Sequence, residues 1–427
     1  MIDIKLIREK PEIVKESQKK RGLLVENISK VIESDIKWRA LKESVDSLRN
    51  KRNIISQKIN EAKKAGKKAP DLIREAQEIP KLLEEKEKQM NELKEKRDLI
   101  LKEIPNILDK SVPTGGPEKN KVLKVYGKIP KFKFKIKDHS DLLEALDLLD
   151  TKKASEVSGS RFYYLKGDLV KLNYAIINFA LDFFKKNGFT LIQPPFMLRK
   201  KALEGALPLS NFQDMIYKIE SEDLYLIGTA EHAINAYYMN EIIPNSRLPL
   251  KFAGISSCFR KEAGSHGKDT KGIFRIHQFE KIEQFSFSRP EDSKKEFDIL
   301  LKNSEEILKK LEIPFRFVIL SSQETGRVAS KTIDFEGWFP SQNAYRELGS
   351  CSNCLDFQAR RSNIKYQDKS DLKFVHTLNN TAIPTQRMMV CLIENNQQPD
   401  GSIKIPKVLW PYTSFKEIKA KNKQIKK

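Results

Sequence analysis

Cysteine and long apolar runs are scarce in this chain, and each shortage excludes a class of protein. Four cysteines in 427 residues cannot build a disulfide scaffold, so we expect reduced thiols. No run approaches the roughly 20 apolar residues that a membrane helix needs. The first residues, MIDIKLIREK, lack the apolar core of a signal peptide. The sequence therefore predicts a soluble, cytoplasmic protein with no membrane partner.

An excess of basic over acidic residues gives the chain a strong positive charge. Lysine and arginine number 79 against 58 aspartates and glutamates, which is a formal net charge of +21. Such an excess favours anionic partners, above all nucleic acid or phosphates. A general lysine-rich bias of composition is the alternative. The chain is also too long for one ordinary core, so two or three domains are expected.

Two apolar stripes near the N-terminus have the alternating three–four spacing of a coiled coil. The first contains Trp38, Leu41, Val45, Leu48, Ile55 and Ile59, and the second contains Leu72, Ala76, Ile79, Leu83, Met90, Leu93 and Ile100. Gly66 and Pro70 break the helix between them and make a tip at 63–70. We predict an antiparallel helical hairpin within residues 1–110, an arm roughly 50 Å long that projects. Its basic tip favours contact with nucleic acid over a purely structural role.

Charged residues and a proline interrupt the stripes. Arg52 stands in the first stripe, and Lys86 and Arg97 stand in the second. Pro80 should remove a backbone hydrogen bond, so we expect a kink or a late helix start there.

The rest of the chain mixes strands and helices. We expect a linker at 111–135, after a stretch rich in proline and glycine, and a second domain at 136–427. Helical spacing is found at 169–184, 297–311 and 388–395, and strand patterns at 188–197, 224–227, 252–255, 315–320 and 333–338. The links look too short for repeated crossovers. We therefore predict the α+β class, with an antiparallel sheet flanked by helices.

Residues 259–281, FRKEAGSHGKDTKGIFRIHQFEK, combine fixed charges with a polar loop. The pattern predicts two antiparallel strands that present Arg260, Glu262 and Arg275, joined by a loop that contains Lys268 and Lys271. These cations suit a triphosphate and a second anionic substrate in one cleft. An ordinary charged surface hairpin is the alternative.

Three weak motifs follow one another in the order found in class II aminoacyl-tRNA synthetases. They are GFTLIQPPF near 188–197, the segment 259–281, and TLNNTAIPTQRMMVCLIENNQ near 377–396. Among these enzymes the chain resembles seryl-tRNA synthetases of the archaeal and eukaryotic kind. That resemblance rests on GTAEH at 228–232, KIEQF at 281–285, YRELGSCSNCLDFQARR at 345–361 and VSGSRFYYLKGD at 157–168. It covers nearly the whole chain, arm included, and implies the class II synthetase fold.

The resemblance implies an ATP site in which two anions must meet, because a carboxylate attacks the α-phosphate. Arg260 would bridge that phosphate and the amino-acid carboxylate, and Arg275 and Arg387 would brace the γ-phosphate. Glu262 and Phe279 would contact the adenine. Further ATP positions are Lys261, Ile276, Leu348 and Gly349, and the implied Mg²⁺ ligands are Glu347 and Ser350. Cys351 and Cys354 suggest zinc, but no other cysteine or histidine has a paired spacing, so zinc is not expected.

For serine, the resemblance implies Thr229, Ala230, Glu231, Arg260, Glu283, Asn379 and Thr381. A pocket that bonds the hydroxyl and has no spare volume rejects alanine and threonine without a separate editing domain. Two residues depart from the family pattern. Pro384 precedes the arginine of the third motif, and Gly349 stands where a larger or β-branched residue is common.

The implied activity is ATP- and Mg²⁺-dependent formation of seryl-adenylate, followed by transfer of serine to the 3′ end of tRNA(Ser). The resemblance leaves tRNA(Sec) open as a second acceptor. The arm would contact tRNA from the partner subunit of a homodimer, and the loop around Lys268 would meet the acceptor end. Two alternatives remain: a paralogue that loads a carrier other than tRNA, and a non-enzymatic coiled-coil protein that binds nucleic acid.

Overall fold

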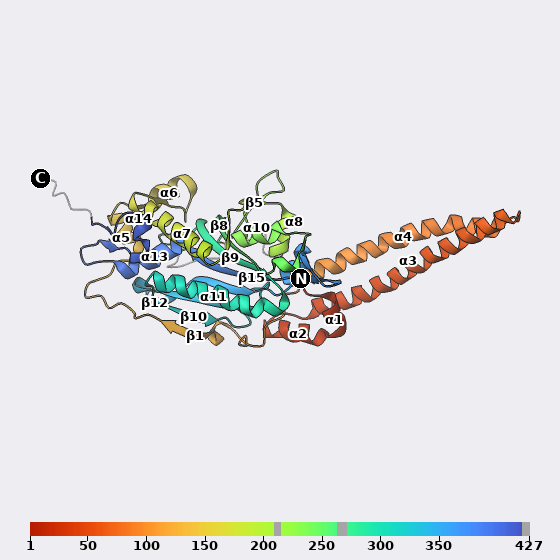
Figure 1. Ribbon diagram of the computed structural model, residues 1–427, viewed down its shortest axis with the longest axis horizontal. Helices are drawn as coiled ribbons and strands as arrows, with labels where there is room; N and C mark the ends of the chain where they lie inside the picture. Colours follow the sequence, from red (N-terminus) through yellow and green to blue (C-terminus); the bar gives the residue numbers. More distant parts are fainter. Residues whose placement is uncertain (209–214, 263–270, 421–427) are drawn as a thin grey trace. The chain divides into compact units, whose positions relative to one another are not determined.

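The computed structural model describes residues 1–208, 215–262 and 271–420. The chain divides into two compact units (Figure 1). Residues 2–19 and 23–105 form a helical unit, and Met1, residues 20–22 and residues 106–427 form the second unit. No helix among the described residues has both the length and the apolar composition needed to cross a membrane.

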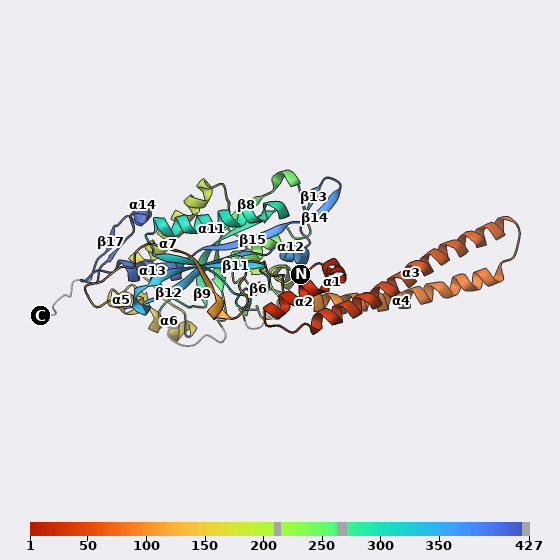
Figure 2. The same cartoon turned by 90° about the horizontal axis from the view of Figure 1, so that it is seen from below.

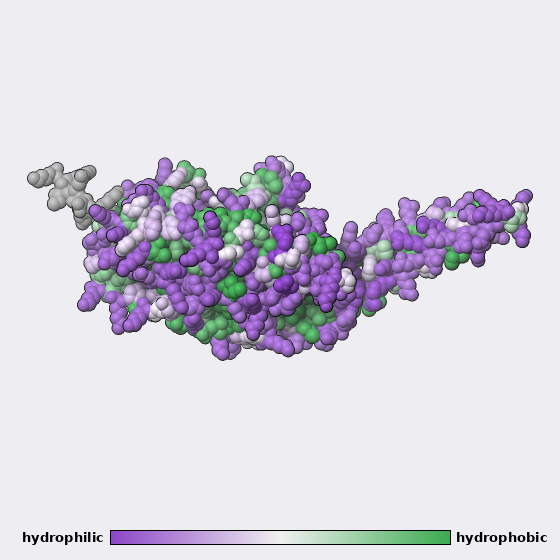
Figure 3. Space-filling view, viewed as in Figure 1, coloured by the Kyte–Doolittle hydropathy of each residue, from purple (hydrophilic) through white to green (hydrophobic). Residues whose placement is uncertain are grey.

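The helical unit contains α1 (Ile4–Glu9), α2 (Pro11–Lys20), α3 (Glu26–Lys64) and α4 (Pro70–Lys102). The two long helices run side by side (Figure 2), and residues of both predicted stripes pack together between them. Val45 and Ile55 of α3 pack with Ile79 and Leu83 of α4. The 39 residues of α3 span about 58 Å. The predicted coiled-coil hairpin is confirmed, and the face of it that Figure 3 shows is mostly hydrophilic.

The turn between α3 and α4 is formed by the residues expected to break the helix. Gly66 has φ +67°, a conformation that glycine adopts without strain, and Pro70 occupies the first turn of α4. Of the two alternatives expected at Pro80, the late helix start is wrong, because α4 runs from Pro70 to Lys102, and the kink stays a prediction. Pro80 is exposed, so water can replace the lost backbone donor.

Arg97, which interrupts the second stripe, is buried in an ion cluster. Its Nη1 donates to Oδ1 of Asp35 over 2.8 Å, and its guanidinium lies 4.7 Å from the Trp38 ring centre. Arg8 and Arg39 also bind Asp35, whose side chain is 2% exposed. Burial would raise the pKa of Asp35, but the bonds from Arg8 and Arg97 lower it overall. The positive charge of Arg97 in the second stripe is therefore balanced by the buried carboxylate of Asp35.

The second unit is built around an eight-stranded sheet in the order β1-β10-β11-β12-β15-β9-β8-β4. Neighbouring strands are antiparallel, except that β4 and β8 are parallel. The strands are β1 (Lys121–Tyr126), β4 (Thr190–Ile192), β8 (Leu250–Phe259), β9 (Gln278–Ser288), β10 (Phe315–Ile319), β11 (Lys331–Phe339), β12 (Ala344–Asn353) and β15 (His376–Pro384). The predicted fold class is confirmed. Residues 111–135 are more than the expected linker, because β1 is an edge strand paired with β10.

Three long helices pack against this sheet, and they are α7 (Asp168–Lys186), α11 (Ser293–Lys310) and α13 (Thr385–Asn396). Alternate residues of a strand face opposite sides of a sheet. Asn380 of β15 and Gln284 of β9 form hydrogen bonds with α11. Their neighbours Thr381 and Glu283 therefore face the other side, which carries the candidate site.

Shorter elements complete the second unit. The helices are α5 (His139–Ala145), α6 (Thr151–Ser158), α8 (Lys200–Ala206), α10 (Ala230–Tyr237), α12 (Phe357–Ser362) and α14 (Trp410–Thr413). The small sheets are β14 (Asp371–Phe374) with β13 (Lys365–Asp368) and β7 (Ile242–Ile243), β16 (Ile403–Lys404) with β17 (Glu417–Ile418), β2 (Leu149–Asp150) with β3 (Tyr164–Leu165), and β5 (Met197–Leu198) with β6 (Tyr225–Leu226). α10 packs on β8 and β9, and α12 packs on β15. Both short helices contribute side chains to the candidate site.

Candidate active site

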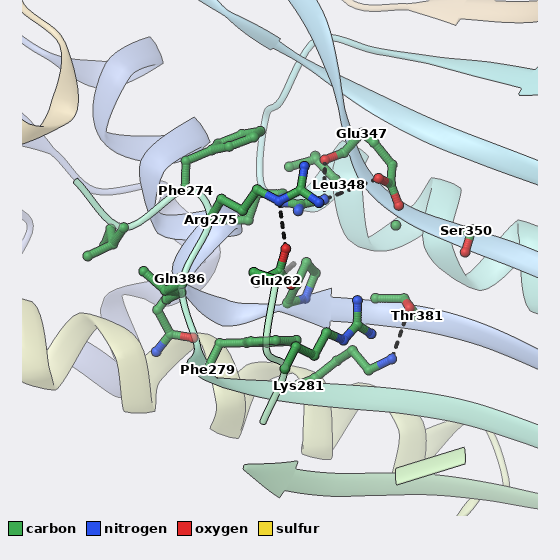
Figure 4. A pocket seen from close by; sticks show the side chains of 16 residues that line it. Glu262, Phe274, Arg275, Phe279, Lys281, Glu347, Leu348, Ser350, Thr381 and Gln386 are labelled. Carbon is green, nitrogen blue, oxygen red and sulfur yellow. Dashed lines mark hydrogen bonds and ion pairs between the residues drawn. The ribbon is translucent and has the colours of Figure 1, made fainter. Parts of the chain in front are cut away.

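A pocket is formed by β9, β12, β15, the start of α13 and the connection from β8 to β9 (Figure 4). The predicted ATP-site residues that line it are Arg260, Glu262, Arg275, Ile276, Phe279, Glu347, Leu348, Gly349, Ser350 and Arg387. Lys261 lies outside the lining, and its backbone N–H donates to the carbonyl of Met215. The expectation that two strands present Arg260, Glu262 and Arg275 is wrong. β8 ends at Phe259 and β9 begins at Gln278, so these three residues belong to the connection between the strands.

Two ion pairs cross the pocket, and we call their members, Glu262, Arg275, Glu347 and Arg387, the ATP side. Nε of Arg275 donates to Oε2 of Glu262 over 2.6 Å (Figure 4). Nη1 of Arg387 donates to the backbone oxygen of Glu347 over 2.9 Å and lies 3.3 Å from its Oε2. Arg275 and Glu347 are 40% and 50% exposed, and their partners Glu262 and Arg387 are 12% and 25% exposed. Pairs this open to water contribute at most about 1 kcal/mol, so a phosphate can replace them.

Arg260 is fixed by contacts that leave the end of its side chain available. Its Nε donates to the backbone oxygen of Gly228 over 3.1 Å, and its guanidinium lies 5.2 Å from the ring centre of Phe279. Within the described part of the chain, neither terminal nitrogen of Arg260 has a hydrogen-bond partner. A ligand with two oxygens can therefore bind there.

Phe274 is a pocket residue that the sequence did not single out. Its ring centre lies 4.9 Å from the guanidinium of Arg387 and 5.2 Å from that of Arg346. A cation–π contact of this kind holds a guanidinium in place without using its N–H donors. The available signal was the position of Phe274 directly before Arg275 in the second motif.

Carboxyl groups gather where the Mg²⁺ ligands were expected. Glu347 and Ser350 line the pocket, and Asp334 of β11 is paired with Ser350 across the sheet. Burial, and then the charges of Glu347 and Glu336, raise the pKa of Asp334 to about 8. Crowded carboxyl groups gain from a nearby cation, so these oxygens fit a Mg²⁺ ion shared with phosphates. In residues 1–208, 215–262 and 271–420, no three histidine, cysteine, aspartate or glutamate side chains are grouped to hold a metal by themselves.

Beside Arg260 lies a largely buried polar cluster, which we call the serine side. It contains Thr229, Glu231, Lys281, Glu283, Asn379 and Thr381, of which Glu231 and Thr381 are half-buried. Oγ1 of Thr229 and Oγ1 of Thr381 each donate to Oε2 of Glu283 over 3.3 Å. Lys281 forms an ion pair with the same carboxylate, and the two side chains are 5% and 1% exposed. Lys281 was not singled out by the sequence, although KIE places it on the same strand face as Glu283. Its ammonium supplies the charge that a buried carboxylate needs.

Glu231 lies at the start of α10, next to the fully buried Ala230. Oε1 of Glu231 accepts hydrogen bonds from Nε2 of Gln358 over 2.7 Å and from Nδ2 of Asn379 over 3.0 Å. Burial, and then the charge of Glu283, raise the pKa of Glu231 to about 7. The structure thus brings the residues predicted to hold serine together.

The two departures from the family pattern have local explanations. A β-carbon on Gly349 would lie 2.5 Å from Cζ of Phe335 and 2.9 Å from Cβ of Thr381, so these side chains fill the space. Pro384 ends β15 in an extended conformation, with φ −85° and ψ 104°. It therefore serves as the boundary between that strand and the helix that carries Arg387.

The connection between β8 and β9 was expected to supply two further cations. Lys268 lies outside the described residues. Lys271 binds Asp138 and Asp141 at the start of α5, over 2.8 and 2.7 Å. It is absent from the lining of the main pocket, so the expectation that it holds an anionic substrate there is not met.

The family comparisons agree with this fold and site. Residues 217–396 match the model of the tRNA synthetase class II core domain (G, H, P, S and T), and residues 1–108 match the seryl-tRNA synthetase N-terminal domain. Fold and pocket together thus define a class II aminoacyl-tRNA synthetase.

Similarity to individual proteins shows which family of this class the chain belongs to. A serine–tRNA ligase of Nitrosopumilus maritimus (strain SCM1) is 46% identical over 415 residues, covering 96% of this chain and 98% of the relative. The structure of seryl-tRNA synthetase from Pyrococcus horikoshii complexed with ATP is 44% identical, covers 99% of this chain and 100% of its own, and has a TM-score of 0.94. The cytoplasmic serine–tRNA ligase of Naegleria fowleri, in complex with AMP, is 38% identical, covers 99% of each chain and has a TM-score of 0.88. The chain belongs to the seryl-tRNA synthetase family, which confirms the resemblance.

Proposed function

We propose that this chain activates L-serine with ATP to form seryl-adenylate and transfers the serine to the 3′ end of tRNA(Ser). The position of Arg260 carries the proposal. It lines the pocket of exposed ion pairs and also bonds Gly228, the neighbour of Thr229 in the buried cluster. The Nitrosopumilus relative is named a serine–tRNA ligase and the Pyrococcus structure holds ATP, which supports the same reaction here.

The reaction brings the carboxylate of serine against the α-phosphate of ATP, and both groups are anions. Arg260 would bind an oxygen of each and stabilise the negative charge of the transition state. Arg275 and Arg387 would exchange Glu262 and Glu347 for the γ-phosphate. Glu262, once released, would accept a hydrogen bond from the adenine amino group, and Phe279 would stack on the base. The serine carboxylate is itself the nucleophile and pyrophosphate leaves, so no protein nucleophile is needed.

Glu347 and Ser350 would hold Mg²⁺ against the phosphates. The ion supplies positive charge to the phosphate oxygens as charge builds up on the leaving group. Ile276, Leu348 and Gly349 line the same space.

The serine side would select the amino acid. Glu231 and Glu283 would accept from the ammonium, and Thr229 and Thr381 would adjoin it, while Asn379 holds Glu231. Alanine lacks the hydroxyl group of serine, so it would leave the buried acceptor of that hydroxyl unpaired. This disfavours alanine strongly, by up to about 10⁴-fold. Ala230 and Asn379 are at most 7% exposed, and such a closed pocket leaves little volume for the extra methyl group of threonine.

The helical unit would bind tRNA through charge and shape. Lys63, Lys64, Lys67 and Lys68 are exposed around the turn between α3 and α4. Contacts of this kind are made mainly to phosphates and weaken with salt. The loop that contains Lys268 would meet the acceptor end.

We further propose that the enzyme works as a cytoplasmic homodimer in which one subunit's arm holds tRNA for its partner. Two apolar side chains near the first motif, Tyr174 of α7 and Leu191 of β4, are 57% and 38% exposed and support an interface there.

The direct test is ATP–pyrophosphate exchange with each of the twenty amino acids, followed by charging of tRNA(Ser). Serine alone should support exchange. Replacing Lys63, Lys64, Lys67 and Lys68 together by alanine should lower kcat/KM for tRNA about tenfold or more and leave exchange unchanged. Exchange with another amino acid, or delivery of serine to a carrier other than tRNA, would contradict the proposal.

A further inference from the structure

A chain of side chains behind Glu231 has no role in the reaction as described so far. Nε2 of Gln358, on α12, donates to Oε1 of Glu231 over 2.7 Å. Oε1 of Gln358 in turn accepts from Oγ1 of Thr377, on β15, over 2.6 Å. Gln358 and Thr377 are fully buried. Neither residue was singled out by the sequence, and neither lines the main pocket.

The ionised carboxylate of Glu231 decides which way the amide of Gln358 points. A carboxylate can only accept, so Nε2 of Gln358 faces Glu231 and Oε1 is left to accept from the hydroxyl of Thr377. The frame around the pair is also fixed, because the backbone N–H of Thr377 bonds Leu355 and the N–H of Cys354 bonds the carbonyl of Thr377. The donor is therefore held in place before any ligand arrives.

The two oxygens of Glu231 have different surroundings. Oε1 accepts from both Gln358 and Asn379, whereas no residue that the structure describes donates to Oε2. An ammonium ion can approach Oε2 without displacing either amide.

We propose that Gln358 is a positioning residue for serine, which holds Glu231 ionised with Oε2 presented to the substrate ammonium. This inference rests on the proposed function, because it assumes that serine is the ligand bound beside Glu231. Gln358 acts through Glu231 and does not touch the substrate itself.

The electrostatics around Glu231 make its ionisation sensitive to the lost donor. Burial and the charge of Glu283 raise its pKa to about 7, while Lys281, the Gln358 hydrogen bond and Arg260 act in the opposite direction. Glu283 and Lys281 face it from β9, and Arg260 from the connection after β8. The thiol of Cys354 faces it from the end of β12. Without the amide donor, the protonated form of Glu231 becomes more favourable. Fewer enzyme molecules near neutral pH then carry a carboxylate that can bind an ammonium ion.

The test is Gln358→Met, which keeps the volume and removes the donor. Losing a hydrogen bond to a charged group should raise the KM for serine about tenfold and leave the KM for ATP within about twofold. The acid limb of kcat/KM for serine should move up by about one pH unit, because this profile reports groups of the free enzyme.

Two sets of controls separate positioning from a general loss of packing. Gln284→Met makes the same change at another fully buried glutamine, which binds Asn303 on the opposite face of the sheet. It should leave the acid limb where it is. Thr377→Val should repeat part of the Gln358→Met effect, whereas Thr377→Ser, which keeps the hydroxyl, should stay near wild type. The threonine pair also serves if Gln358→Met does not fold.

The outcomes are distinct. If the wild-type chain shows no serine-dependent exchange, the proposed function fails and this inference fails with it. If the wild type is active, an unchanged serine KM and pH profile in folded Gln358→Met would overturn the inference alone. Equal rises in the KM for serine and for ATP, matched by Gln284→Met, would also overturn it, because they indicate a structural role.

Discussion

The ATP side and the serine side of the site differ in how far their ion pairs are exposed to water. On the ATP side, Arg275 and Arg387 are 40% and 25% exposed and form ion pairs with Glu262 and Glu347. On the serine side, Lys281 and Glu283 are 5% and 1% exposed. Exposed pairs are weak and can be exchanged, whereas breaking a buried pair leaves a charge without a partner. The difference indicates which contacts a substrate replaces and which it uses as they stand.

Arg260 belongs to neither side alone, so its loss should have the largest effect. Arg260→Ala should lower serine-dependent ATP–pyrophosphate exchange about 10³-fold, because one group stabilises charge on both reactants. Arg260→Lys should recover little, since an ammonium cannot grip two oxygens in the planar manner of a guanidinium. Arg199→Ala, at an exposed arginine outside the pocket, is the matched control. Exchange near the wild-type rate in Arg260→Ala would refute the assigned role.

The contrast between the two sides predicts unequal effects of the same substitution on folding. Glu283→Gln removes the negative charge that balances the buried Lys281 and should lower the free energy of unfolding by about 3 kcal/mol or more. Glu262→Gln weakens the pair with Arg275, whose members are 12% and 40% exposed, and should cost less, about 1 kcal/mol. Urea-induced unfolding at neutral pH measures both values. Similar losses in the two variants would remove the distinction on which the comparison rests.

Packing between the two sides is tested at Gly349. A valine there overlaps Phe335 and Thr381, and overpacking of this kind costs about 1–3 kcal/mol. Gly349→Val should therefore unfold at a lower temperature and raise the KM for serine by moving Thr381. Adding Phe335→Leu to Gly349→Val should recover part of both losses, as thermal melts and exchange assays can show. Full stability of Gly349→Val alone would mean that the space is not filled as described.

His232 provides a test of burial on the serine side through pH. Burial first, and then the charges of Lys281 and Arg260, lower its pKa to about 3. The unfolded chain takes up this proton near pH 6.5, so stability is present above that pH and is lost as the pH falls toward 3. At pH 5 the loss amounts to roughly 2 kcal/mol.

His232→Leu removes this proton-binding group, so the variant should lose less stability than the wild type between pH 7.5 and 5. Unfolding at both pH values measures the difference. Parallel losses in the two proteins would show that His232 is more open to water than the structure indicates.

The sequence was informative where structure follows from neighbouring residues. The stripes of the helical unit, the break at Gly66 and Pro70, and the charged motif residues depend on local spacing. The errors arise where a local rule is overridden. Pro80 is exposed and does not delay the start of α4. β1 was not predicted as a strand, because its lysines and full exposure are typical of a protected edge strand.

The residues that the sequence analysis missed depend on partners far along the chain. Gln358 meets Glu231 across 127 positions, and Asp35, which the sequence did not single out, meets Arg97 across 62. A buried neutral glutamine gives no signal in charge or periodicity. The motif residues could be predicted from the sequence, because the resemblance is defined by residue types and their order and not by contacts.

The most direct test is a crystal structure with serine and α,β-methylene ATP, which cannot release pyrophosphate. The account predicts that Arg275 and Arg387 leave Glu262 and Glu347 for phosphate oxygens. It also predicts that the Lys281–Glu283 and Gln358–Glu231 contacts keep their present geometry around the bound ammonium. Intact arginine–glutamate pairs, or a rebuilt network behind serine, would contradict it.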